Sequence, residues 1–401
     1  DKNKLTIYGE ANTYAQQWAE KNGFSFMAQR LDSEDAMIWG KVTDQTGKGI
    51  EKVFVSIYDK DGRKTETQTY TDSDGRWSYN RAVKDRNYRI YFWHEEYQFQ
   101  FSYIDSTADG AAVDITGTKI CEKGQENPQE DFEYSKINGN DIRITKFKGT
   151  GNKVVIPAQI EGYAVKELGN SVFANNRELK EIILPSELTT IGAAAFKNCT
   201  VLTTVRMGAD TEYIGNEAFR GCTSMKEIQL PIQMKGIGEY AFYECIGLTE
   251  LHLPDSLNYY NYRAFAKCVN LKKINYPLSL NNGADNAFEE DRNLTEITVP
   301  EGVETLAPHA FHSASYLQKV ALPDSLQAIG NAAFEGCSGI SQIQISEHVT
   351  SVGEYAFYGC TGIKELVLPD GLESYGYRAF AGCDALEKIN YPKSLTSGAD
   401  N

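Results

Sequence analysis

Hydrophobic positions in the last two thirds of the chain recur with a fixed period. Ten phenylalanines follow one another at intervals of 23 residues: Phe173, Phe196, Phe219, Phe242, Phe265, Phe288, Phe311, Phe334, Phe357 and Phe380. A period of this length is typical of repeat arrays, in which each unit buries its apolar side chains against the neighbouring units. The sequence therefore predicts a stacked solenoid with a continuous inner core.

The pattern within one repeat predicts a short strand. In the copy that starts at Phe357, the conserved spacing is represented by Cys360, Leu366, Leu368 and Pro369. The two leucines are separated by one residue, which is strand spacing, and proline ends a strand because it has no N–H to donate. We expect one parallel strand per repeat and a turn or single helical turn at the phenylalanine. The fold class is thus an α/β-type repeat solenoid of mostly short strands.

These residues resemble the BspA-type leucine-rich repeats of bacterial surface proteins, over roughly residues 131–401. The resemblance implies an N-terminal cap at residues 132–170, followed by the ten repeats. Blocks of five repeats are duplicated, because residues 240–243 return as 355–358 and residues 283–286 return as 398–401. We expect the array to be truncated and the native protein to continue after Asn401.

Residues 36–120 follow a different rule, the strict alternation of apolar and polar side chains. Val53, Val55 and Ile57 alternate with other residues, and Asp74-Gly75 marks a turn. Seven candidate strands indicate a small antiparallel β-sandwich. The segments 40–44 and 71–79 resemble the prealbumin-like or immunoglobulin-like domains that act as spacers in bacterial surface proteins. The polar residues 121–131 are expected to link this domain to the array.

Residues 1–30 read as a strand, a short helix and a second strand, with Tyr14-Ala15 opening the helix and Asn22-Gly23 closing it. This unit is similar to the segment that closes BspA-type arrays, which implies the C-terminal cap of a preceding array. An independent N-terminal helix is the alternative.

The net charge and the length of the apolar runs limit the classes of partner expected for this chain. The formal net charge of -15 argues against nucleic acid, because phosphate binding needs clustered Lys and Arg. Apolar runs are too short for a membrane span, so we expect no membrane insertion by these residues. We expect a monomer.

The sequence favours no catalytic residue, metal or cofactor. Seven cysteines share one place in the repeat and lack the C-x-x-C spacing of metal sites, so we expect them to pack in the core as small hydrophobes: Cys199, Cys222, Cys245, Cys268, Cys337, Cys360 and Cys383. His309 and His312 lie three residues apart without a third ligand, so a surface pair is expected. The turns at residues 59–62 and 72–75 fit hairpins better than calcium loops.

The variable strand position ten residues after each phenylalanine is the candidate ligand-binding face, because strand alternation turns it outward. Its candidate residues are Arg206, Gln229, His252, Asn275, Thr298, Gln344 and Asn390, joined by the aromatic residues Tyr259, Tyr262 and Tyr377. An alternative is that tyrosines replace isoleucine in the core, as Tyr260 and Tyr375 do by register.

The resemblance implies a non-catalytic, extracellular binding or adhesion fragment of a bacterial cell-surface protein. Its ligand would be a protein or glycan on host or neighbouring cells. An alternative is an accessory or spacer region of a large secreted enzyme whose catalytic domain lies outside this chain. A structural stalk is a third reading.

Overall fold

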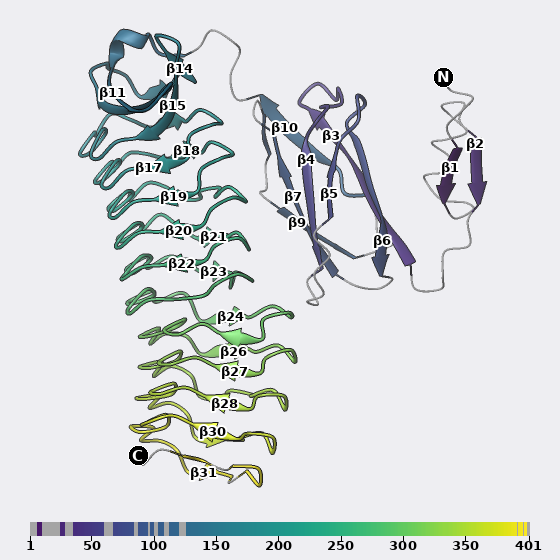
Figure 1. Cartoon of the computed structure of the whole chain (residues 1–401), viewed down its shortest axis with the longest axis vertical. Helices are drawn as coiled ribbons and strands as arrows, with labels where there is room; N and C mark the ends of the chain where they lie inside the picture. The colour runs from purple at the N-terminus through teal and green to yellow at the C-terminus, as the bar shows by residue number, and fades with distance from the viewer. Residues whose placement is uncertain are drawn as a thin grey trace. The chain divides into compact units, whose positions relative to one another are not determined.

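The computed structural model describes residues 6–9, 25–28, 35–59, 67–83, 87–94, 97–99, 103–107, 112–119, 126–390, 392–395 and 397–398. The chain divides into two compact units, Asp1–Cys121 and Glu122–Asn401 (Figure 1). None of the described residues forms a helix long and apolar enough to cross a bilayer.

The first unit begins with a parallel strand pair, β1 (Thr6–Gly9) and β2 (Ser25–Ala28), in which Thr6 lies opposite Ser25. Parallel neighbours require a crossover connection, which agrees with a strand, helix and strand order. The predicted helix and its Asn22-Gly23 end lie outside the described residues. The assignment of this segment as a cap therefore stays a prediction.

Two four-stranded sheets follow, in the orders β6-β3-β10-β8 and β5-β4-β7-β9. Side chains from both sheets share one core that includes Val42, Ile57, Trp77 and Phe92. The strands are β3 (Asp35–Asp44), β4 (Phe54–Asp59), β5 (Thr67–Tyr70), β6 (Arg76–Val83), β7 (Asn87–Trp93), β8 (Tyr97–Phe99), β9 (Tyr103–Thr107) and β10 (Ile115–Lys119).

The prediction of an entirely antiparallel arrangement is wrong at one pairing. Strands β3 and β10 run parallel, with Val42 opposite Ile115. They are the first and last strands of the two sheets, so the intervening strands provide the long connection that parallel neighbours need. The immunoglobulin-like assignment stays a prediction.

The second unit starts with the first strands of an eight-stranded sheet, which cover the first end of the solenoid core. After η1 (Gln129–Asp131), β11 (Phe132–Asn138) and β12 (Asp141–Phe147) form an antiparallel hairpin, and β12 pairs in parallel with β15 (Tyr163–Leu168). The short β14 (Gln159–Ile160) pairs with β15 in an antiparallel orientation. Phe132, Ile142 and Ile144 are buried in the same cluster as the repeats.

The repeats stack as rungs with two columns of parallel strands (Figure 1). The first strand column contains the residues eight to ten positions after each phenylalanine. Its strands are β13 (Lys153–Val155), β16 (Glu181–Ile183), β18 (Thr204–Arg206), β21 (Glu250–Leu251), β23 (Lys273–Ile274), β24 (Glu296–Thr298), β26 (Lys319–Ala321), β29 (Glu365–Leu366) and β31 (Lys388–Ile389).

The second strand column precedes the phenylalanines. It consists of β15, β17 (Thr190–Ile191), β19 (Tyr213–Ile214), β20 (Gly236–Ile237), β22 (Tyr259–Tyr260), β25 (Thr305–Leu306), β27 (Ala328–Ile329), β28 (Ser351–Val352), β30 (Ser374–Tyr375) and β32 (Ser397–Gly398). The prediction of one strand per repeat is therefore wrong, because most described rungs have two; the rungs of Phe219 and Phe334 lack the strand of the first column. Two-residue strands are too short to produce a visible alternation of apolar and polar residues.

A turn with alternating backbone handedness carries each phenylalanine into the core. Around Phe196, Ala194 and Asn198 have φ of 53° and 59°, and the same two positions are left-handed in all ten rungs. The Phe196 N–H donates to the Ala218 carbonyl of the next rung at 2.7 Å, whereas the Cys199 N–H returns to the Phe196 carbonyl. The predicted solenoid with a 23-residue period is confirmed, and the described residues contain almost no helix.

The phenylalanine stack has one discontinuity. From Phe173 to Phe288, neighbouring rings lie 5.1–6.0 Å apart and within 15° of parallel, but Phe288 and Phe311 are 6.5 Å apart and tilted by 35°. At this rung Gly283 stands where the adjacent rungs have the buried side chains of Tyr260 and Leu306. The missing side chain coincides with the join between the two five-repeat blocks.

Candidate functional site

The first strand column displays the predicted ligand-binding position on its outer side. Among the candidate residues at this position, Gln229, Thr298 and Gln344 are exposed, and His252 is half-buried. The residues one position earlier, such as Val205 and Ile297, are buried in the core. Strand alternation thus separates a fixed interior from a variable exterior.

Three of the predicted residues are engaged within the solenoid. The Arg206 side chain is only 17% exposed and lies 3.3 Å from the Glu181 carboxylate. The Asn275 amide donates to the Leu253 carbonyl at 2.8 Å and accepts from the Leu253 N–H at 2.7 Å. Asn390 makes the same pair of bonds with Leu368. These two amides act as lateral backbone partners between rungs.

The predicted tyrosines do not share this face. Tyr259 belongs to β22 in the second strand column and lies over Gly236, where an added Cβ would come within 2.3 Å of its ring. Tyr262 and Tyr377 lie in the turns that precede Phe265 and Phe380. The grouping of all ten candidates on one strand face is therefore wrong. By contrast, Tyr260 is 1% exposed, as its core register predicted.

A row of charged residues accompanies the outer face of the first strand column. Oppositely charged members of neighbouring rungs approach one another, as in Lys273 with Glu250 at 3.5 Å and Lys388 with Glu365 at 3.9 Å. These side chains are largely exposed, so each pair adds little to stability. The row gives the face charges of both signs, which favours selection among partners more than tight binding.

The thiols of the repeats form a ladder inside the solenoid. Each Sγ donates to the phenylalanine carbonyl of the preceding rung, for example Cys199 to Phe173 at 3.0 Å. Burial raises the pKa of the Cys199 and Cys337 thiols to about 12. Such thiols are protonated at neutral pH and are poor nucleophiles and metal ligands. The seven described cysteines are free.

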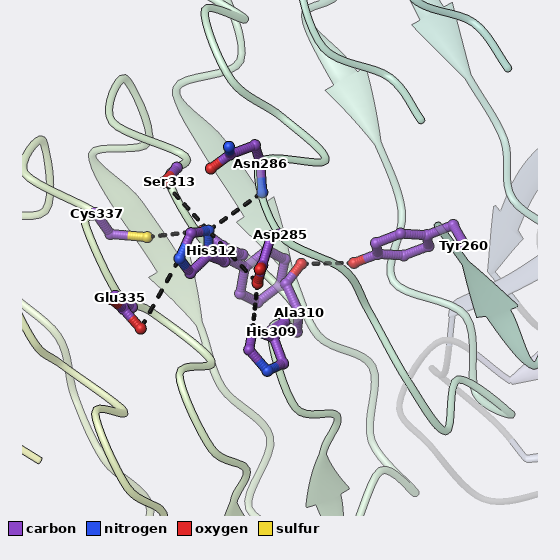
Figure 2. A network of polar contacts seen from close by, with 10 residues as sticks. Tyr260, Asp285, Asn286, His309, Ala310, His312, Ser313, Glu335 and Cys337 are labelled. Atoms are coloured by element: carbon purple, nitrogen blue, oxygen red, sulfur yellow. Dashed lines mark hydrogen bonds and ion pairs between the residues drawn. The ribbon is translucent and has the colours of Figure 1, made fainter. Parts of the chain in front are cut away.

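Two histidines of the array, His309 and His312, lie at the discontinuity (Figure 2). His309 Nδ1 is 2.6 Å from the Asp285 carboxylate, and His312 Nδ1 accepts from the Asn286 N–H at 3.1 Å. His312 Nε2 faces Glu335 at 3.8 Å, and its side chain is only 17% exposed. The prediction of a surface pair is therefore only partly correct, because the His312 side chain is mostly buried within a polar network. Within the described ranges no group of three or more His, Cys, Asp or Glu could hold a metal ion.

The acidic turn at residues 72–75 uses its carboxylates locally. Asp72 Oδ1 accepts from the Asp74 and Arg76 N–H groups at 2.9 and 2.8 Å, and Asp74 pairs with the Arg76 guanidinium at 2.5 Å. This is the bonding of a hairpin turn. Most of the matching turn at residues 59–62 lies outside the described residues.

An open depression of about 430 Å³ lies along the turns that lead from the first strand column to the second. Asp324, Ser325, Gln327, His348 and Thr350 line it. Sequence reasoning did not single out these residues, because they belong to variable turn positions without a recognisable motif.

Two clusters of tyrosines at the phenylalanine turns were also not predicted from the sequence. Tyr240 contacts Tyr243 and Tyr262 edge to face, each at 5.3 Å between ring centroids. Tyr355 contacts Tyr358 and Tyr377 in the same way at 5.6 Å. The duplicated Tyr-Ala-Phe-Tyr sequence was the available signal, and its three-residue spacing brings two of the rings of each cluster together.

Several solved structures are similar to parts of this chain. Among solved structures, a Treponema pallidum leucine-rich repeat protein is 27% identical, with a TM-score of 0.41 over 54% of this chain and 91% of that one. A leucine-rich cell surface protein from Faecalibacterium prausnitzii is 24% identical, with a TM-score of 0.35 over 67% and 95%. The pneumococcal vaccine antigen PcpA is 21% identical, with a TM-score of 0.41 over 69% and 87%.

No curated protein matches the sequence significantly. The model of the BspA-type leucine-rich repeat region, however, matches residues 166–293 and 281–401, which is more than half of the chain. These residues carry the 23-residue rungs, the phenylalanine stack and the thiol ladder described above. The chain therefore belongs to the BspA-type leucine-rich repeat family.

Proposed function

We propose that this chain is a non-catalytic recognition module of a bacterial cell-surface protein, and that it binds a protein ligand through the outer face of the first strand column. The observation that carries the proposal is the contrast along this column between uniformly aliphatic, mostly buried residues and exposed, varied ones. Gln229, Thr298, Gln344 and Val367 represent the exposed set. Val367 is 62% exposed although it is apolar.

The dimensions of the face support a protein ligand. Arg206 and Asn390 are eight repeats apart, and parallel strands stack about 4.8 Å apart, so the face extends for about 40 Å. Stable protein interfaces bury about 800 Å² on each partner, which such a stripe can supply. The charged row beside it would orient the partner.

The side-chain chemistry supports a role without catalysis. Six of the seven described thiols are buried, and burial raises the pKa of thiols such as Cys337. The histidines at the discontinuity bind backbone and carboxylate groups of neighbouring rungs. Repeat proteins of this kind present extended surfaces for binding.

The test is the binding of the 401-residue chain to immobilised fibronectin, fibrinogen, laminin and collagen, with a Thr298→Arg, Gln344→Arg variant. The matched control carries Thr305→Arg and Gln327→Arg, which place the same changes on an exposed residue of β25 and on an exposed residue directly before β27. We expect the first variant to bind at least about tenfold more weakly, as for loss of an interface centre, and the control to bind as the wild type does. Equal losses, or no binding by the wild type, would contradict the proposal.

A further inference from the structure

Regular phenylalanine turns are joined from rung to rung by a backbone hydrogen bond at a fixed register position, two residues before the phenylalanine. The Tyr240 N–H donates to the Tyr262 carbonyl at 2.9 Å, and the Ala332 N–H donates to the Glu354 carbonyl at 2.7 Å. A backbone carbonyl accepts hydrogen bonds but does not titrate in the physiological range. These turns therefore have no acceptor that responds to pH at this position.

The turn at the discontinuity between the five-repeat blocks uses a different acceptor. The Asn286 N–H has the register of the Tyr240 N–H, but it donates to His312 Nδ1 at 3.1 Å (Figure 2). The second strand column is also interrupted here, because one sheet ends at β22 and the next begins at β25. An ionisable side chain thus replaces the backbone acceptor where the second strand column is broken.

The direction of this bond determines which nitrogen of the ring carries the proton. A backbone N–H can only donate, so Nδ1 must offer a lone pair, and the proton of the neutral imidazole must lie on Nε2. Nε2 faces the Glu335 carboxylate of the following rung at 3.8 Å. Protonation of the ring would turn Nδ1 into a donor and place two N–H groups against each other. The bond to Asn286 would then be lost.

Acidic groups on both neighbouring turns can receive the protonated ring. Asp285 Oδ1 of the preceding turn lies 4.0 Å from His312 Nδ1, and Glu335 of the following turn lies beside Nε2. On the same turn, His309 lies 5.8 Å away between ring centroids and shares Asp285 with His312, and Ser313 Oγ lies 3.2 Å from Nδ1. An imidazolium ion has two N–H groups, and the two carboxylates can accept both. The backbone N–H gains no such replacement.

We propose that the discontinuity is a pH-responsive joint between the two five-repeat blocks. Histidine is the side chain that ordinarily changes its charge between pH 5 and 8. As the pH falls through this range, the His312 ring takes up a proton, binds Asp285 and Glu335, and leaves the Asn286 N–H unpaired. The joint needs no ligand, so it can be present whether or not the first strand column binds a protein.

Other bonds across the discontinuity do not titrate in this range. The Gly283 N–H donates to the Pro308 carbonyl at 3.0 Å. Burial raises the pKa of the Tyr260 and Tyr276 hydroxyls, which bond to backbone groups across the same gap and keep their protons. Acidification should therefore loosen the phenylalanine turn without separating the blocks.

Hydrogen–deuterium exchange of the whole chain, read at single amides and corrected for the intrinsic exchange rate at each pH, tests the proposal. We expect the protection of the Asn286 amide to fall at least about fivefold between pH 7.5 and 5.5, the effect of one unpaired N–H. The Tyr240 amide is the internal control and should keep its protection. Global unfolding is a poorer readout, because burial raises the pKa of Asp291, which stabilises the chain as the pH falls.

Three variants separate loss of the acceptor from loss of the fold. In His312→Asn, the amide oxygen can take the place of Nδ1 but does not titrate, so Asn286 should stay protected at both pH values. Glu335→Gln keeps the imidazole and removes one carboxylate, which should lower the midpoint of the pH profile by about 0.5 units. His348→Asn changes an exposed histidine outside the discontinuity and should leave the wild-type profile unchanged.

Constant protection of Asn286 between pH 7.5 and 5.5 in the wild type would overturn the proposal, as would an equal loss of protection in His312→Asn. An equal loss at Tyr240 would also overturn it, because acid would then loosen the regular turns as well. An unchanged midpoint in Glu335→Gln would contradict the transfer of the ring to the carboxylates.

Discussion

At the residue scale, Asp291 is a carboxylic acid at a repeat position that holds cysteine in most rungs. It takes the place of a ladder cysteine and is 2% exposed. Neither carboxyl oxygen has a hydrogen-bond partner, whereas the equivalent thiols donate to a phenylalanine carbonyl. Burial therefore raises the pKa of Asp291 well above its usual range. A buried carboxyl without partners costs stability, and it costs more when ionised.

Replacement of Asp291 by Cys should stabilise the chain in a pH-dependent manner. The pKa of Asp291 is higher in the folded than in the unfolded chain, so the carboxyl group destabilises the fold least below its unfolded pKa near 3.9. The free energy of unfolding then decreases as the pH rises from this value toward the folded pKa. We expect Asp291→Cys to add about 1–3 kcal/mol at pH 7 and less at pH 4. Urea unfolding at both pH values measures this, with Ala314→Cys as the uncharged control. The same gain at both pH values would refute the role of ionisation.

At the element scale, the phenylalanine turn depends on left-handed backbone that is mostly occupied by residues other than glycine. The position two residues after phenylalanine holds Gly221, Gly336, Gly359 and Gly382 in four rungs but Glu244 at φ 59° in another. An L residue with a side chain is strained in this region, whereas glycine adopts it freely. The turn is thus held by its bonds to the next rung rather than by local preference.

Glu244→Gly should relieve this strain and raise the free energy of unfolding by about 0.5–1 kcal/mol. Glu244→Val should lower it, because a β-branched residue fits left-handed backbone poorly. Glu244 is exposed, so neither change disturbs the core. Denaturant titrations of both variants provide the measurement. A glycine variant less stable than the valine variant would be incompatible with this explanation.

The sequence predicted the elements whose signal is a long-range period. The spacing of Phe196, Cys199 and Val205 correctly placed the core and the first strand column. It missed the second strand column, because pairs such as Thr190 and Ile191 are too short to show alternation. The left-handed turn positions were hidden because Glu244 and similar residues do not signal positive φ.

The candidate site was only partly predictable for a related reason. Alternation showed which residues leave the core, as for Thr298 and Gln344, but not what they contact between rungs. Asn275 and Arg206 bind groups about one repeat away in the chain, Leu253 and Glu181. Such contacts depend on how the rungs stack, which a period in the sequence does not specify.

At the scale of the whole molecule, two tyrosines bridge the discontinuity between the five-repeat blocks. The Tyr260 hydroxyl donates to the Ala310 carbonyl at 2.5 Å (Figure 2). The Tyr276 hydroxyl accepts from the Ala307 N–H at 2.8 Å. In regular rungs these backbone groups bond to the neighbouring rung, as Ala333 does with Phe311 at 2.8 Å. The hydroxyls replace the ladder where Gly283 interrupts it.

Removal of either hydroxyl should weaken the array at this rung. Tyr260→Phe and Tyr276→Phe each leave a buried backbone group unpaired, which costs about 1–3 kcal/mol. Tyr375→Phe is the matched control, because Tyr375 has the register of Tyr260 in the second block. Equilibrium unfolding measures the loss. Equal losses of stability from Tyr260→Phe and Tyr375→Phe would contradict the claim that the Tyr260 hydroxyl stabilises the array at the discontinuity.

The central claim is that recognition uses the first strand column. Hydrogen–deuterium exchange of the chain, alone and saturated with the tightest-binding matrix protein, tests it most directly. We predict slower exchange at residues 296–298, 319–321 and 342–344 on binding, and no change at residues 305–306 and 327–329 of the second strand column. Protection confined to the second strand column would contradict the account.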